Sequence, residues 1–171
     1  QLASEAESAS RTVALGFATD GDADAALRTA GDALDDGYET AHAGYVDSWR
    51  EYLAPVDLPA AVADDDYLAD QYRSAAMVLK AVEDKTFTGA GVASPSVPWG
   101  SAVSARESSD HGYNFVWARD LYQVFTAFDA MGDVDSAVDH LEYVFEYQHD
   151  GDGFLPQNTF LDGRTRWGGE Q

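Results

Sequence analysis

The sequence predicts an all-α fold in which pairs of helices alternate with long loops. Apolar residues recur in steps of three and four along four stretches, which is the period of a helix with one buried face. Glycines, prolines and capping aspartates bound these stretches. The segments at about 86–116 and 149–171 lack a helical period and are rich in Gly and aromatic residues. This pattern is typical of a helix bundle or of an α/α toroid, and periodicity alone leaves both open.

The N-terminal stretch is expected to form one long helix after a short β-leaning run, TVALGFAT at 12–19, which is too short to define a sheet. Asp20 or Asp22 can cap this helix, and the prolines at 55 and 59 end it. Gly31 and Gly37 weaken the helix, so we expect a bend near them. Its apolar stripe consists of Leu27, Ala30, Leu34, Tyr38, Ala41, Tyr45, Trp49 and Tyr52.

Three shorter helices are expected further along the chain. The second runs over about 66–84, and the third begins near Asp120 and ends at Gly132, which fits the left-handed C-cap position. Asp133 can cap the fourth helix, and so short a connection makes the third and fourth helices antiparallel neighbours. The three stripes are Leu68, Tyr72, Ala75, Ala76, Leu79 and Val82; Leu121, Val124, Phe125 and Phe128; and Val134, Ala137, Val138, Leu141, Val144 and Phe145.

The charge of the chain excludes some partners. Acidic residues outnumber basic ones by 31 to 10, which gives a formal net charge of -21. Such a charge repels nucleic acid phosphates and anionic membrane surfaces, so neither is expected as a partner. An acidic, lysine-poor surface suits concentrated salt, which screens the self-repulsion, so a halophilic source is favoured over an ordinary acidic protein. The cytoplasm of such an organism is the favoured location, with an extracellular one as the alternative.

The sequence does not indicate cysteine chemistry or a metal site. The chain has no cysteine, so disulfides and thiolate chemistry are excluded. His111 and His149 are too isolated to indicate a metal site. The run DGDG at 150–153 is similar to the start of a calcium loop, but Phe154 stands where a third ligand belongs. No metal and no cofactor are therefore expected.

Three loop patches combine aromatic rings with amides, carboxylates or arginine. Sugars need this mixture, because their C–H faces pack on aromatic rings while their hydroxyls need donors and acceptors in fixed directions. The patches therefore indicate a carbohydrate site. They are GVASPSVPWGS at 91–101, HGYNFVWARD at 111–120 and DGFLPQNTFLDGRTRWGGEQ at 152–171.

Each aromatic or amide candidate also has a plainer explanation. Trp99, Trp117 and Trp167 are candidate sugar platforms, and core packing explains them as well. Gln157 is a candidate for binding hydroxyls, as is its neighbour Asn158, or both merely turn the chain after a proline. The binding site predicted from these patches also includes Tyr113 and the loop carboxylate Glu170.

The adjacent pair Arg119 and Asp120 is the sharpest of the site candidates. Aspartate can accept hydrogen bonds from two neighbouring hydroxyls, and arginine donates a rigid fork that lysine cannot replace. Side by side at a helix start, the two residues could grip both hydroxyls at the end of a sugar ring. The alternative, which spacing alone favours, is a helix cap at Asp120 beside a surface arginine.

The loop patches closely resemble the prokaryotic glucoamylase and glucodextranase enzymes of glycoside hydrolase family 15. The segments EDKTFTGAGVASPSVPWG, GYNFVWARDLYQVF and DGFLPQNTFLDGRTRWGGEQ carry the resemblance, which extends over nearly the whole chain. It implies an (α/α)6 toroid for the catalytic domain, of which 61–171 would form the N-terminal part. Residues 1–20 would then be the end of an N-terminal β-sandwich, with its last strand, or its linker. Residues 21–60 would hold the linker helix.

The same resemblance implies an exo-acting α-glucosidase that inverts configuration and releases glucose from the non-reducing ends of α-glucans. In the family, the pair that matches Arg119 and Asp120 holds the terminal glucose, with Trp117 beside it and Trp167 matching an aromatic near the cleavage point. Inversion needs a carboxyl that acts as acid and another that acts as base. The family's acid belongs to a Gln-Leu-Asp-Glu-like segment, of which Gln171 would be the first residue, and Glu170 does not match it. We therefore expect an inactive fragment with no catalytic residue of its own.

Two alternatives from other classes remain open at this point. One is a stand-alone helical carbohydrate-binding module, and the other is a structural all-α domain without a ligand. An α-glucan or oligosaccharide is the expected partner. A fragment of a toroid would also expose apolar helix faces, so self-association is expected. A preference for α-1,4 or α-1,6 linkages is not indicated.

Overall fold

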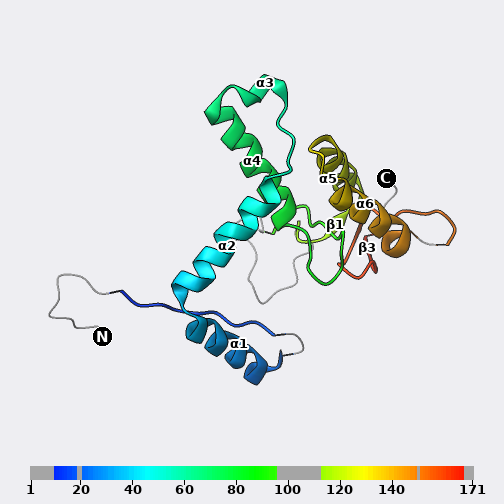
Figure 1. Cartoon of the computed structure of the whole chain (residues 1–171). Coiled ribbons are helices and arrows are strands. Elements are labelled where there is room, and N and C mark those ends of the chain that lie inside the picture. Colours follow the sequence, from blue (N-terminus) through cyan, green and yellow to red (C-terminus); the bar gives the residue numbers. More distant parts are fainter. Residues whose placement is uncertain (1–9, 19–20, 96–112, 150, 168–171) are drawn as a thin grey trace. The chain divides into compact units, whose positions relative to one another are not determined.

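The computed structural model describes residues 10–18, 21–95, 113–149 and 151–167 (Figure 1). The chain divides into two compact units, Gln1–Tyr52 and Leu53–Gln171. Helices account for most of the described residues, which confirms the predicted all-α class. No helix in the described ranges is long and apolar enough to cross a membrane.

The first unit holds two helices where the sequence predicts a single bent one. Helix α1 (Ala23–Asp36) begins at Asp22, whose side chain accepts a hydrogen bond from the Ala25 amide at 2.9 Å, so the predicted cap is confirmed. It ends at Gly37, where φ is 82°, a conformation that favours glycine. Helix α2 (Tyr38–Leu53) follows at once. Of the two predicted bend positions, Gly37 is therefore the one that breaks the helix, because Gly31 keeps helical geometry.

Residues 10–18 form neither helix nor strand. Gly16 lies so close to the backbone of α1 at Ala26 that a Cβ there would collide with it. A strand needs a neighbouring extended backbone for its hydrogen bonds, and the other described residues of this unit are mostly helical. The β-strand expected within 12–19 is therefore not formed among the described residues.

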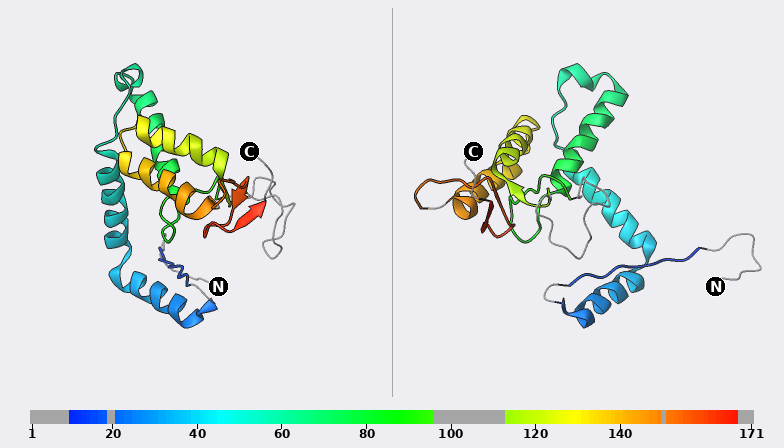
Figure 2. Two further views of the ribbon diagram at one scale, coloured as in Figure 1. Left: turned by 90° about the vertical axis from the view of Figure 1, so that its right-hand side faces the viewer. Right: turned by 180° about the vertical axis from the view of Figure 1, so that it is seen from behind.

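The second unit is built on three main helices with a short one ahead of them. Helices α5 and α6 run side by side (Figure 2). Their connection has the predicted chemistry: Gly132 has φ 80°, and Asp133 caps α6 by accepting a hydrogen bond from the Ser136 amide at 3.1 Å. The helices are α3 (Ala60–Ala63), α4 (Asp66–Ala81), α5 (Ala118–Ala130) and α6 (Val134–Tyr143), and α6 continues into a π-helical turn, η3 (Val144–Gln148).

The core of this unit consists of two apolar clusters. One joins α4, α5 and α6, and Phe128 lies fully buried in it. Truncating such a side chain to alanine costs about 3–5 kcal/mol. The other cluster lies beneath the loops and joins Ala90, Val116, Leu121 and Tyr143. This second cluster fixes the chain on both sides of Trp117.

A small antiparallel sheet, absent from the sequence prediction, ties two of the loop patches together. Its strands are β1 (Val116–Trp117), β2 (Asn158–Thr159) and β3 (Thr165–Trp167), in the order β1-β2-β3. Strands of two or three residues are too short to show an alternating pattern, which is why the sequence predicts loops here.

Helix α6 buries a different face from the predicted apolar stripe. Its buried residues are Ser136, Ala137, His140 and Tyr143, and only Ala137 belongs to the predicted stripe. The rest of that stripe is exposed or partly exposed, because polar side chains of α6 make the contacts with the loops. The exposed apolar residues are Val134, Val138, Leu141 and Phe145.

Candidate functional site

The sheet places an amide between two tryptophans. In its register Trp117 lies opposite Asn158, and Asn158 lies opposite Trp167. Residues directly opposite in an antiparallel pair share one face of the sheet. The row Trp117–Asn158–Trp167 therefore occupies one face, while Val116 and Thr159 share the other face.

Two residues of this row, Trp117 and Asn158, each carry a buried polar atom without a hydrogen-bond partner among the described residues. The Nε1 of Trp117 and the Oδ1 of Asn158 are buried and make no hydrogen bond within the described part of the chain. Asn158 is only 3% exposed. An unpaired buried polar group costs about 1–3 kcal/mol, so these two atoms call for a buried water or another partner that the described residues do not supply.

The outer aromatic residues are more open. Trp167 is 56% exposed, so one side of its ring is available as a platform. The Tyr113 ring is tilted against Trp117, with the ring centroids 6.1 Å apart. The three predicted aromatic candidates in the described ranges thus lie on or beside one sheet, whereas Trp99 and Glu170 fall outside the described residues.

Arg119 and Asp120 occupy the first turn of α5, directly after Trp117. The helix begins at Ala118, and its N-cap residue is Trp117, whose side chain makes no capping bond. The alternative reading of Asp120 as the helix cap is therefore wrong, because the helix starts two residues earlier. A carboxylate in the first turn is still favoured by the helix dipole.

The two side chains of this pair are open to solvent. The Nε of Arg119 lies 4.0 Å from the Oδ2 of Asp120, at the outer limit of an ion pair, and the side chains are 68% and 40% exposed. Exposed pairs of this kind contribute little to stability. At this distance the ion pair uses little of the hydrogen-bonding capacity of the guanidinium and the carboxylate.

Gln157 joins the two loop patches through its backbone. Its carbonyl accepts a hydrogen bond from the Ala118 amide at 3.4 Å, at the first residue of α5. The loop before β2 is thereby tied to the helix start that carries Arg119. The side chain of Gln157 is half-buried.

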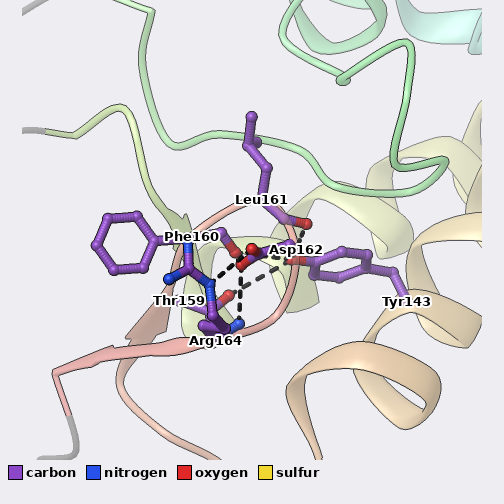
Figure 3. Close-up of polar contacts among 6 residues, drawn as sticks. All are labelled: Tyr143, Thr159, Phe160, Leu161, Asp162 and Arg164. Atoms are coloured by element: carbon purple, nitrogen blue, oxygen red, sulfur yellow. Dashed lines mark hydrogen bonds and ion pairs between the residues drawn. The ribbon is translucent and has the colours of Figure 1, made fainter. Parts of the chain in front are cut away.

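Two buried side chains at the end of α6 hold the sheet in place, and the sequence prediction missed both. The Nε2 of Gln148 donates to the Val116 carbonyl at 3.1 Å and to Thr159 Oγ1 at 3.0 Å. The Tyr143 hydroxyl lies 2.8 Å from the Leu161 carbonyl and 3.1 Å from the Phe160 carbonyl (Figure 3). Burial raises the pKa of Tyr143, so its hydroxyl stays protonated and able to donate.

The turn between β2 and β3 also rests on the end of α6. Gly163 has φ 79° and lies against the backbone carbonyl of Tyr147, where a Cβ would collide. The Arg164 Nε lies 2.7 Å from Asp162 Oδ2, and this hydrogen bond lowers the pKa of Asp162. Because the Asp162–Arg164 pair is exposed, the contacts of Gly163 and Tyr143 contribute more to the position of this turn.

A second polar cluster lies at the other end of α6 and serves the scaffold. Lys80 Nζ lies 2.6 Å from Glu83 Oε2 and donates to Ser136 Oγ at 2.8 Å. Glu83 Oε1 accepts the Gly89 amide at 3.2 Å. Burial opposes ionisation of Glu83, but Lys80 and the Gly89 amide outweigh it and lower the pKa of the carboxyl. This cluster fixes the loop that follows α4.

Metal binding finds no support in the described ranges, where no three His, Asp or Glu side chains are grouped to hold an ion. The chemistry of the side chains around the sheet suits a neutral polyhydroxylated ligand. The sheet offers the aromatic faces of Trp117 and Trp167. The first turn of α5 offers the guanidinium donors of Arg119 and the carboxylate acceptor of Asp120.

Sequence comparison matches both units of the chain to known families. Residues 68–150 match the profile of "Glycosyl hydrolases family 15", and residues 1–54 match that of "Glucodextranase, domain N". The second match ends close to the boundary between the two compact units.

One curated relative and one solved structure agree with these matches. A glucoamylase of Clostridium sp. (strain G0005) is 38% identical over 148 residues, which is 86% of this chain and 20% of the relative. The crystal structure of a bacterial glucoamylase complexed with acarbose is 38% identical, with a TM-score of 0.74 over 86% of this chain and 21% of that one. The chain thus spans about a fifth of the length of the proteins it matches.

Proposed function

Because this chain is of the glycoside hydrolase family 15, glucoamylase type, we propose that the whole protein releases glucose from the non-reducing ends of α-glucans with inversion of configuration. The observation that carries the proposal is 38% identity to a glucoamylase over 86% of the chain. The row Trp117–Asn158–Trp167 beside Arg119 and Asp120 supports it, because these are side chains that suit a sugar ring.

We assign sugar binding to this part of the protein. Arg119 and Asp120 hold adjacent hydroxyls of the terminal ring, the first as a fork of donors and the second as an acceptor. Trp117 and Trp167 cover the C–H faces of the rings. Tyr113 and Gln157 border the same site, and Trp99 and Glu170 are proposed to complete it.

The hydrolytic step needs two further groups. An inverting enzyme uses a general acid and a general base, with the two carboxyls roughly 6.5–9.5 Å apart so that a water fits between base and sugar. None of the described carboxylates is assigned to either role. This chain contributes the residues that bind the terminal glucose and orient it relative to the general acid and the general base. Such binding aligns the scissile bond with the two catalytic carboxyls.

The domain arrangement of the family supports a matching proposal for the scaffold. Residues 61–171 would form the N-terminal part of an (α/α)6 toroid, 21–60 the linker helix region, and 1–20 the end of a β-sandwich or its linker. The match of 1–54 to a glucodextranase N-terminal domain supports this division. The exposed apolar face of α6 would pack on further toroid helices, and in the isolated chain it would drive self-association.

The net charge supports a proposal about the surroundings in which the protein works. A charge of -21 on 171 residues disfavours nucleic acid as a partner and suits a halophilic source. We expect the free energy of unfolding of the isolated chain to rise as KCl is raised from 0.1 M to 2 M, since salt screens repulsion between carboxylates. A stability that does not change with salt would remove the support for halophily.

The activity is tested with the full-length protein and maltooligosaccharides of defined length. Glucose should be the first product, and NMR should show it first as the β-anomer, because the scissile bond is α and the mechanism inverts. Acarbose, which a related glucoamylase binds, should inhibit competitively. Release of longer oligosaccharides as first products would contradict the proposal. Binding of oligosaccharides without release of glucose would also contradict it and would favour a binding module.

A further inference from the structure

We propose that Gln148 is a positioning residue, which sets the distance between the two strands that carry Trp117 and Asn158. It acts on the sugar-binding residues through the backbone and does not contact the substrate. The inference rests on the proposed function and adds a residue that governs how tightly the terminal glucose is held.

The contacts of Gln148 give it this role. Its Nε2 donates to the Val116 carbonyl on β1 at 3.1 Å and to Thr159 Oγ1 on β2 at 3.0 Å. Val116 directly precedes Trp117, and Thr159 directly follows Asn158, so one amide group bonds to the neighbours of both site residues. Since β1 and β2 pair over only two residues each, a single side-chain bridge is a large part of their attachment.

The path from Gln148 to the sugar-gripping pair is short. Trp117 is the N-cap residue of α5, and Arg119 and Asp120 lie in the first turn of that helix. The Ala118 amide is bonded to the Gln157 carbonyl, so the helix start moves with β2. A shift of β1 against β2 would therefore change where Trp117, Arg119 and Asp120 lie relative to the Asn158 amide.

The π-helical turn explains how Gln148 reaches the sheet together with Tyr143. In an α-helix, residues five apart point roughly 140° away from each other. Residues Val144–Gln148 form a π turn, and both side chains contact β2 through Thr159 Oγ1, at 3.4 Å from the Tyr143 hydroxyl and 3.0 Å from Gln148 Nε2. Such turns often occur at functional sites.

The hydrogen bonding of Gln148 shows that a contribution to stability does not by itself explain this residue. Gln148 is buried, and its Oε1 has no hydrogen-bond partner within the described part of the chain. An amide with one end unpaired contributes less to stability than a fully bonded one, because the lost hydration of that end is not replaced. What the residue supplies is a fixed separation of two backbone segments.

The test uses two nearly isosteric variants in the full-length protein, Gln148→Met and Thr159→Val. Gln148→Met removes both donated bonds and keeps the side-chain length, and Thr159→Val removes the acceptor on β2. We expect KM for maltotriose and the dissociation constant of acarbose to rise by roughly tenfold to a hundredfold in Gln148→Met. The double variant should bind acarbose no more weakly than Gln148→Met alone, because both changes break one bridge.

The matched control is Gln123→Met, an exposed glutamine on α5, which should leave both constants unchanged. A lowered melting temperature with unchanged KM and acarbose affinity would overturn the inference, since it would show a purely structural role. If Gln148→Met does not fold, Thr159→Val provides the test. We expect Thr159→Val to bind acarbose more weakly than the unsubstituted protein. An unchanged acarbose affinity in Thr159→Val would overturn the inference. If the unsubstituted protein neither binds acarbose nor releases glucose, the proposed function fails first, and this inference fails with it.

Discussion

His140 and Gly91 approach each other so closely that a Cβ on Gly91 would lie 2.8 Å from the Nε2 of His140. The imidazole is fully buried, and its Nδ1 lies 2.8 Å from the Ser136 carbonyl, to which it donates. Its Nε2 has no partner among the described residues, so the neutral ring lies with its acceptor against the glycine backbone. The loop after α4 is packed against α6 through this contact.

Gly91→Ala should therefore destabilise the chain. The added methyl group cannot be accommodated without moving a buried ring, and overpacking of this kind costs about 1–3 kcal/mol. Urea unfolding followed by circular dichroism measures the loss. The control is Gly44→Ala on α2, where nothing lies within 4 Å of the new Cβ and where alanine should stabilise the helix by about 0.5–1 kcal/mol. Equal effects of the two substitutions would contradict the packing described for His140.

The stability of the chain should fall on acidification below about pH 6.5. Burial lowers the pKa of His140 from its ordinary value of 6.5, although Glu83 and Asp139 favour its protonated form and Lys80 opposes it. The unfolded chain then takes up a proton before the folded one, so the free energy of unfolding decreases as the pH falls from 6.5 towards the folded pKa.

Glu83 adds a second loss at lower pH. Its pKa is lowered from 4.5, so its contribution is present above that pH and is lost as the pH falls through the folded value. Urea unfolding at closely spaced pH values separates the two windows. The slope between pH 6.5 and 4.5 should become shallower in His140→Gln, and an unchanged slope would assign the effect to another group.

Arg119→Ala should reduce activity of the full-length protein far more than it reduces stability. Two hydrogen bonds from a charged fork contribute about 3–6 kcal/mol together, which corresponds to roughly a hundredfold or more in kcat/KM. Arg119→Lys should restore little, because an ammonium cannot present the planar fork. Arg50→Ala, which removes an exposed arginine paired with Asp47 on α2, is the control and should leave turnover intact. Normal turnover of maltose by Arg119→Ala would reject the assigned sugar grip.

Trp167→Ala should weaken acarbose binding without lowering the melting temperature. The ring is 56% exposed, so its removal opens no cavity in the core, and exposed substitutions usually change stability by no more than about 0.5 kcal/mol. Loss of one stacking face should raise the dissociation constant roughly tenfold, as measured by titration calorimetry. Tyr38→Ala, at a ring that is 59% exposed on α2, is the matched control. Equal affinities in the two variants would show that Trp167 is not a platform.

Local chemistry made much of the scaffold predictable from the sequence. The caps at Asp22 and Asp133 are present, and so is the left-handed glycine at 132, because each depends on residues a few positions apart. The pairing of α5 with α6 followed from the length of their connection. Trp117 and Trp167 were identified as site candidates from their composition, although their place in one sheet was not.

The remaining features depend on contacts between distant segments. Gln148 bonds to a strand 32 residues earlier, and His140 meets a loop nearly fifty residues away. The face of α6 that is buried in this chain is partly polar for the same reason, so it differs from the apolar stripe that hydrophobic periodicity predicts. The sequence leaves Asn158 open between binding hydroxyls and turning the chain after a proline, because an amide suits either role.

The π turn that ends α6 holds one residue more than a regular α-helical turn would need. If one residue between Val144 and Gln148 were lost, the glutamine would stand four residues after Tyr143, and residues four apart share one face of an α-helix. The glutamine could then still reach β1 and β2 from regular α geometry. A deletion earlier in α6 would instead rotate everything after it by roughly 100° about the axis. Among related proteins, helices one residue shorter at this turn should therefore keep the same hairpin.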